Sequence, residues 1–222
     1  MAFNPQELKE AVYKGALPDT WGMSYNGTSP KVAEAVTGAF TATNAAFQHY
    51  AAVFKDERLS RSERAKAYAK GRDFVNSKVD AKVKSARAAL ESEEREYRTQ
   101  REYALTAGMT DEMALSLAVQ LRQVGGEGAF GVAGSDFRFI QAVARVPAAV
   151  SGFTQEQVDS LLGVGFERHK PDIAALGKSV EMGRMSVDRA EKTFLDTAFL
   201  IGNSIDEDDL KAATALENYL KL

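Results

Sequence analysis

The sequence predicts an all-α protein, in which a long antiparallel helical hairpin or rod is followed by a bundle of short helices, with an elongated shape. Three observations lead to this fold class. The chain of 222 residues contains 35 alanines but only four isoleucines, and good helix formers dominate its long stretches. Alternating runs of β-branched residues, which are typical of strands, are scarce. Helix-capping signals recur along the chain.

Residues 1–30 predict a short helix and then an irregular arm. Asn4 and Pro5 begin the helix, and Gly15 ends it. The arm after Gly15 has no hydrophobic period. Its three largest apolar side chains are Trp21, Met23 and Tyr25. The arm either covers the protein's own core or docks on a neighbouring subunit, where Trp and Tyr are effective anchors.

Residues 31–56 predict a helix with a heptad seam. Apolar and small residues recur at steps of four and three, at Val32, Val36, Ala39, Thr43, Ala46, Tyr50 and Val53. Phe40, Phe47 and Phe54 lie seven apart beside this seam and widen the predicted buried stripe. The helix is therefore expected to pack along its whole length.

A second, much longer helix is predicted from the capping box Ser60–Glu63 to Gly108. Its apolar stripe, which can pair with the first seam in an antiparallel hairpin, consists of Tyr68, Val75, Val79, Val83, Ala86 and Leu90. Unbroken, it would be about 70 Å long, whereas a compact chain of this size is only about 45 Å across. Either the helix breaks, at Gly71 or at Asn76–Ser77, or the protein is elongated, and we favour elongation.

Beyond Leu90 this helix is strongly charged, and its only large apolar side chains up to residue 103 are Tyr97 and Tyr103. The segment is either a solvated spacer with ion pairs one turn apart or a contact surface for another subunit. We therefore assign Tyr97 and Tyr103, together with the three arm residues, as candidate partner contacts.

The second half of the chain predicts shorter helices. They begin at Thr110, Ser135, Thr154, Asp172, Ser186 and Ser204. Leu115, Val119 and Leu195 are expected to be buried. Five glycines in ten residues make 125–134 the predicted hinge. The expected organisation is an arm (1–30), a hairpin with one short helix (31–124), the hinge, and a C-terminal bundle (135–222).

The sequence contains no recognisable set of catalytic residues. The chain has no cysteine and two histidines, and no serine lies in a nucleophile-elbow motif. We therefore expect no enzyme, no cofactor, no metal site and no small-molecule substrate. The longest apolar stretches are too short to span a membrane, and residues 1–15 do not resemble a signal peptide. The expected location is cytoplasmic, or the virion if the protein is of viral origin.

Segment 58–87 is strongly basic. It holds ten basic and three acidic residues, a net charge of +7 in a chain whose total is −3. Such asymmetry is typical of a surface that follows phosphates, although solvated helix faces are also rich in Lys and Arg. The candidate phosphate contacts are Lys78, Lys82, Lys84 and Arg87.

These features favour a non-enzymatic structural or assembly subunit of a multi-copy complex, for example a virion, scaffold or connector-type component. It would act through coiled-coil-like helix packing and the N-terminal arm, as a homo-oligomer or within a larger assembly. The alternative is a nucleic-acid-associated or regulatory binding protein that uses segment 58–87.

Overall fold

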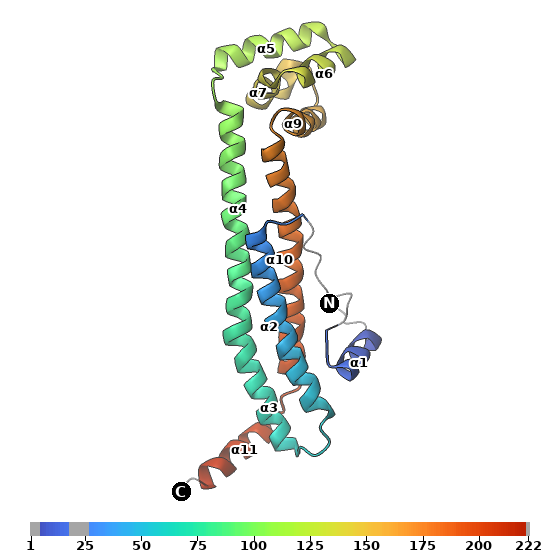
Figure 1. The fold of residues 1–222 in the computed structure, drawn as a ribbon, viewed down its shortest axis with the longest axis vertical. Coiled ribbons are helices and arrows are strands. Elements are labelled where there is room, and N and C mark those ends of the chain that lie inside the picture. Colours follow the sequence, from blue (N-terminus) through green and yellow to red (C-terminus); the bar gives the residue numbers. More distant parts are fainter. Residues whose placement is uncertain (1–4, 18–26, 221–222) are drawn as a thin grey trace. The chain divides into compact units, whose positions relative to one another are not determined.

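The structure is a computed structural model that describes residues 5–17 and 27–220, and over these residues the chain is all-α, as predicted (Figure 1). The elements in order are α1 (Pro5–Lys14), α2 (Pro30–Lys55), α3 (Arg61–Phe74), the π-helical turn η2 (Val75–Val79), α4 (Asp80–Thr106), α5 (Asp111–Val124), α6 (Gly126–Ser135), α7 (Phe137–Arg145), α8 (Ala148–Ser151), α9 (Gln155–His169), α10 (Pro171–Asn203) and α11 (Glu207–Leu220).

The chain forms two compact units. Unit 1 consists of residues 1–91 and 182–222, and unit 2 consists of residues 92–181. This division differs from the predicted one. The glycine-rich segment 125–134, predicted as a hinge between domains, is helical from Gly126 to Ser135. Residues 182–222, expected in a separate C-terminal bundle, belong to unit 1 because α10 buries one face in its core.

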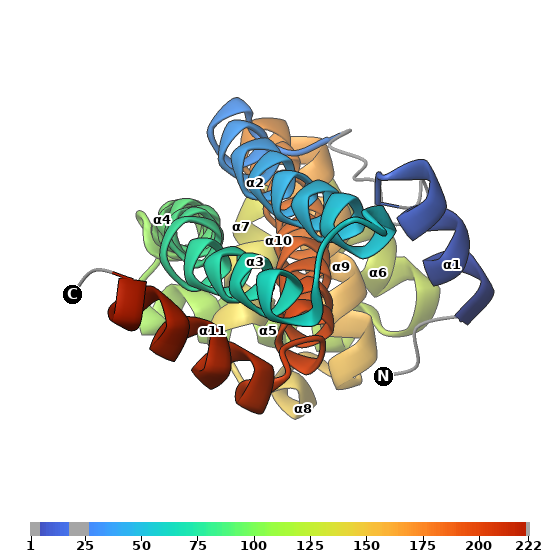
Figure 2. The same ribbon diagram turned by 90° about the horizontal axis from the view of Figure 1, so that it is seen from below.

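The core of unit 1 lies between α2, the α3–η2–α4 helix and α10, which run side by side (Figures 1 and 2). All seven predicted seam residues of α2 are buried, and so are all six residues of the facing stripe, which confirms the hairpin. From α10, the core receives Val187, Ala190 and Ile201. Of the three phenylalanines beside the seam, Phe47 is buried, Phe40 is half-buried and Phe54 is exposed.

The second helix of the hairpin is helical from Arg61 to Thr106 without a break. Asn76 and Ser77, one candidate break, lie in the π-helical turn, where the backbone widens but continues. Gly71, the other candidate, is buried inside α3. A Cβ there would lie 3.3 Å from His49 Cδ2 and 3.7 Å from Ile201 Cγ2. Gly71 therefore allows α3 to pack closely against His49 and Ile201. The elongated shape of the molecule stays a prediction.

Local capping determines where most helices begin. The capping boxes Ser60–Glu63 and Thr154–Gln157 are present as predicted. Two other starts were misassigned. Asp136, not Ser135, caps α7, because its Oδ1 accepts the Arg138 N–H at 2.9 Å. Asp206 accepts the N–H groups of residues 208 and 209 at 3.0 and 3.1 Å, in the position expected of Ser204.

α10 continues through the start predicted at Ser186. The Ser186 side chain donates to the Met182 carbonyl at 2.9 Å, inside the continuous helix. Ser can satisfy its hydroxyl in this way one turn back along a helix. The tertiary packing of α10 therefore outweighs the local start signal.

Unit 2 packs α5, α6, α7 and α9 around a small core. Leu121, Ile140 and Leu161 are almost fully buried there. The buried amide of Gln141 on α7 donates from Nε2 to the carbonyls of Ala104 and Ala107, at 2.8 and 3.0 Å. Gln141 thus satisfies carbonyls at the C-terminal end of α4 that have no partner within the helix.

We expect Gly165→Ala to destabilise the protein. A methyl group at this position of α9 would lie 2.7 and 2.8 Å from Cγ1 and Cδ1 of Ile140, which is fully buried and cannot move aside freely. Such overpacking lowers the free energy of unfolding by about 1–3 kcal/mol. Urea-induced unfolding followed by circular dichroism measures the loss.

Gly163→Ala is the matched control, because it lies on the same helix and a Cβ there meets nothing within 4 Å. It should raise the stability by about 0.5–1 kcal/mol through helix propensity. Equal effects of the two substitutions would contradict the close approach of α9 to α7.

Candidate functional site

Arg87, a predicted phosphate contact, is bound to α10 within unit 1. Its Nε donates to Glu191 Oε1 at 2.8 Å, a terminal amino group donates to Asp188 Oδ1 at 3.0 Å, and the same group pairs with Glu191 Oε2. The hydrogen bond to Glu191 outweighs burial and raises the pKa of the Arg87 guanidinium above its ordinary value. Arg87 therefore already holds a carboxylate in the geometry that a phosphate would need.

The three predicted lysines differ from Arg87 in their surroundings. Lys84 pairs with Asp80 one turn earlier, at 2.7 Å. Lys78 and Lys82 are exposed and have no carboxylate within 4.0 Å in the described part of the chain. Lys82 also lines an open groove of about 650 Å³ between α2 and α4, together with Lys31 and Glu34. Only two of the four candidates are thus free cations.

The predicted partner contacts are separated by the structure. Trp21, Met23 and Tyr25 lie outside the described residues. Tyr103 is 73% exposed on α4. Tyr97 is half-buried, because its ring lies against Gly177 of α10, where a Cβ would be only 2.9 Å from Tyr97 Cε2.

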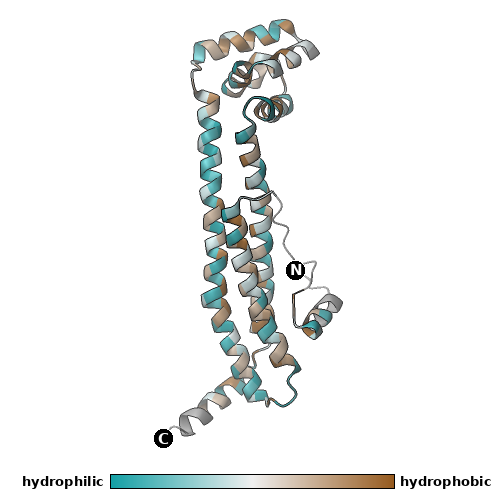
Figure 3. Ribbon diagram, viewed as in Figure 1, coloured by the Kyte–Doolittle hydropathy of each residue, from teal (hydrophilic) through white to brown (hydrophobic). Residues whose placement is uncertain are grey.

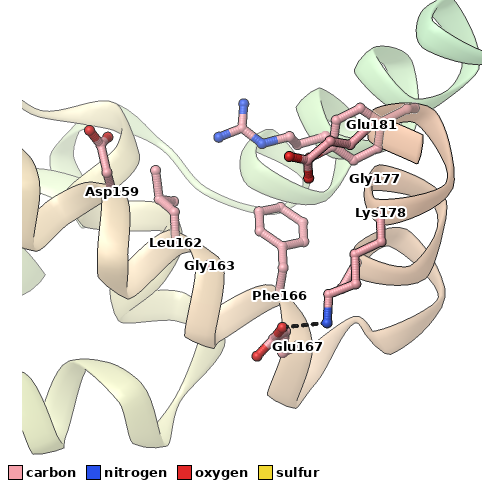
Figure 4. A pocket seen from close by; sticks show the side chains of 11 residues that line it. Asp159, Leu162, Gly163, Phe166, Glu167, Gly177, Lys178 and Glu181 are labelled. Atoms are coloured by element: carbon pink, nitrogen blue, oxygen red, sulfur yellow. Dashed lines mark ion pairs between the residues drawn. The ribbon is translucent and has the colours of Figure 1, made fainter. Parts of the chain in front are cut away.

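Tyr97 forms part of a cleft in unit 2, here called the Phe166 cleft, which has a volume of about 340 Å³ (Figure 4). Small residues on α9 and α10 leave the space that the Phe166 ring partly fills. The cleft is lined by Tyr97, Arg101, Asp159, Leu162, Gly163, Phe166, Glu167, Ala174, Gly177, Lys178 and Glu181. No sequence pattern had indicated it, because its residues on α4 lie far along the chain from those on the consecutive helices α9 and α10.

The charges of the Phe166 cleft are partly neutralised within it. Lys178 Nζ lies 2.7 Å from Glu167 Oε1, and the hydrogen bond between them lowers the pKa of Glu167. Arg101 lies with its guanidinium carbon 5.8 Å from the centre of the Phe166 ring, a cation–π distance. The cleft can hold an apolar group against two aromatic rings and a charged group beside Arg101. Its lining residues include no serine, threonine, cysteine or histidine.

Both histidines make polar contacts between helices. His49 Nε2 lies 3.1 Å from the Ala67 carbonyl, and His169 Nε2 lies 3.1 Å from the Gly134 carbonyl. Within residues 5–17 and 27–220, no group of three His, Cys, Asp or Glu side chains is arranged to hold a metal ion. None of the helices in these ranges combines the length and apolar character needed to cross a membrane.

Exposed large apolar side chains are most numerous on α5 and α10. Leu115 and Val119 on α5 are 51% and 40% exposed, and Met185, Leu195 and Phe199 on α10 are 61–64% exposed. The predicted burial of Leu115, Val119 and Leu195 was therefore wrong. On α5 the small residues Ala114 and Ala118 face the core instead. The sequence left this choice open on α5, because that helix carries two apolar stripes of the same period.

The hydropathy of the chain shows the same contrast. The stretch of α4 that follows Leu90 is largely hydrophilic, whereas α5 carries hydrophobic stretches (Figure 3). Surface that is apolar at helical spacing is typical of a binding face, while single exposed apolar residues are common on any protein. The α5 and α10 faces are therefore the candidate interaction sites.

Comparisons with family models, with curated proteins and with solved structures found no match.

We expect Arg87→Gln to lower the free energy of unfolding by about 1 kcal/mol, because it leaves Asp188 and Glu191 without their partly exposed cation. Lys82→Gln is the matched control and should change stability by less than about 0.5 kcal/mol, as for other surface substitutions. Chemical denaturation measures both. Identical curves for the two variants would show that the Arg87 ion pairs contribute nothing to the fold.

Proposed function

We propose that the protein is a non-enzymatic structural or assembly subunit of a multi-copy complex. The observation that carries this proposal is the second apolar face of helices that already bury a first face in their own core. A partner would bury this second face. Burial of exposed apolar side chains by another surface lowers the free energy of the system.

α10 illustrates this double-faced pattern in unit 1. Its buried face includes Val187, Ala190, Thr193, Thr197 and Ile201. The opposite face presents Met185 and Phe199, two heptads apart, with Leu195 one turn before Phe199. These are three positions of a heptad seam, whose two intervening positions hold Asp188 and Lys192. Complete burial of each such side chain contributes about 1.5–3 kcal/mol.

The N-terminal arm and Tyr103 complete the proposed contact surfaces. Trp21, Met23 and Tyr25 provide large amphipathic or apolar anchors close together in the sequence. In this proposal the subunit acts by helix packing, in the manner of a scaffold, connector or virion component. It would work in the cytoplasm or, if viral, in the virion.

The α10 face is tested by replacing Leu195 and Phe199 together with glutamine. We expect the wild-type chain to gain mass with concentration in sedimentation equilibrium, because copies bury these side chains against each other. The double variant should need a higher concentration for the same mass. Val164→Gln on α9, a substitution of a single exposed apolar residue, should leave the association unchanged.

A wild-type mass of one chain at every concentration would overturn the assembly proposal. Association that the α10 double variant leaves unchanged would remove α10 from the proposed contact surfaces.

The alternative proposal is a nucleic-acid-associated or regulatory protein, and the exposed lysines of the basic segment favour it, among them Lys78 and Lys82, which have no carboxylate within 4.0 Å in the described part of the chain. Lys78→Glu/Lys82→Glu should then abolish a low-salt gel shift of duplex DNA or RNA, because phosphate contacts depend on such cations. Lys14→Glu/Lys192→Glu changes the net charge equally outside segment 58–87 and should preserve the shift. No shift of the wild-type chain at low salt would exclude this alternative.

A further inference from the structure

One exposed face of α5 carries a regular stripe with opposite charges at its two ends. Glu112, Leu115, Val119 and Arg122 follow one another at steps of three, four and three residues, the spacing of a heptad seam, and all four are exposed. Below, these residues are called the α5 stripe. Ala114, Ala118 and Leu121 form the buried face of the same helix.

The charged ends of the α5 stripe have no partners in the described part of the chain. Neither Glu112 nor Arg122 has an oppositely charged group within 4.0 Å. The stem of Arg122 lies beside Gly152, where a Cβ would be 3.4 Å from Arg122 Cγ. The stripe thus presents a carboxylate, two apolar side chains and a guanidinium in a fixed order on a helix of 14 residues.

We propose that α5 pairs with α5 of a second copy of this chain in an antiparallel, two-fold contact. In this pairing Glu112 meets Arg122 of the partner subunit, and Leu115 meets Val119 of the partner subunit. The two-fold axis repeats both contacts in the opposite direction. This contact would be one of the interfaces of the proposed multi-copy assembly. The inference therefore rests on that proposed function.

The order of charges along the α5 stripe favours a second copy of α5 in the antiparallel orientation. A parallel second copy would place Glu112 opposite Glu112 and Arg122 opposite Arg122, which like-charge repulsion disfavours. In the antiparallel arrangement every charge meets its opposite, and the apolar centre is covered by an apolar centre. The helix is therefore complementary to itself without any change of sequence.

Charge reversal tests the pairing in the full chain. Glu112→Arg alone places two cations at each end of the contact, and Arg122→Glu alone places two anions there. Each single variant should raise the dissociation constant at least about tenfold in sedimentation equilibrium. An equimolar mixture of the two single variants should associate again. One copy then carries two cations at the ends of the stripe, and these meet the two anions of the other copy.

The variant with both changes in one chain, Glu112→Arg/Arg122→Glu, should also recover self-association. Gln120→Arg is the control for added charge, because Gln120 is exposed on α5 but outside the stripe. Leu115→Gln should weaken association, whereas Met113→Gln, at an exposed apolar position on another side of α5, should not.

The possible outcomes separate this inference from the assembly proposal. Wild-type-like association of both single variants, or a mixture that stays dissociated, overturns the α5 pairing and leaves an assembly through other surfaces in place. Recovery in the mixture, with a wild-type mass that never exceeds two copies, supports the pairing and overturns the multi-copy assembly. A chain that is monomeric at every concentration overturns both.

Discussion

The burial of one face of α10 against the α2 and α3–η2–α4 hairpin is the interaction on which unit 1 depends. The hairpin alone would leave one side of its core open, and Val187, Ala190 and Ile201 close it. Because α10 is distant in sequence, this contact also brings Asp188 and Glu191 to Arg87. Close approach is possible because Gly183 of α10 lies beside Leu90 and Val32, where a Cβ would be 3.2 and 3.4 Å from their methyl groups. The same packing thus provides the core and organises the charges around it.

Both units expose large apolar side chains on helices whose other face is already packed in a core. On α5, alanines pack in the core while Leu115 and Val119 face solvent, and on α10 Leu195 and Phe199 do the same. A core filled with alanine lets helix axes come close but buries little apolar area from each residue. The larger side chains on the exposed faces would be covered only by another surface, as the proposed assembly requires. This division of residue sizes is the physical basis of the proposed assembly role.

The positive charge of the basic segment is partly neutralised in the folded chain. Along the chain, residues 58–87 carry a concentrated positive charge. In the folded chain, Arg72 lies 3.5 Å from Glu207 and Arg87 pairs with Glu191, so acids from the C-terminal part supply counter-charges. Lys78 and Lys82 stay exposed and have no such counter-charge within 4.0 Å in the described part of the chain. An interaction with phosphates would therefore depend on these two lysines far more than on Arg87.

The sequence by itself determined the helical class, the α2 seam with its facing stripe, and the capping boxes at Ser60 and Thr154. Each of these depends on neighbours within one or two helical turns, and the helical period decides which residues share a face. Tertiary structure alone decided which of two apolar stripes faces the core on α5, since both stripes have the same period. It also decided that α10 continues through Ser186 and that α4 encloses the Phe166 cleft together with the much later helices α9 and α10. These features come from contacts between residues far apart in sequence, whose energies outweigh the weak local signals for a helix start or a hinge.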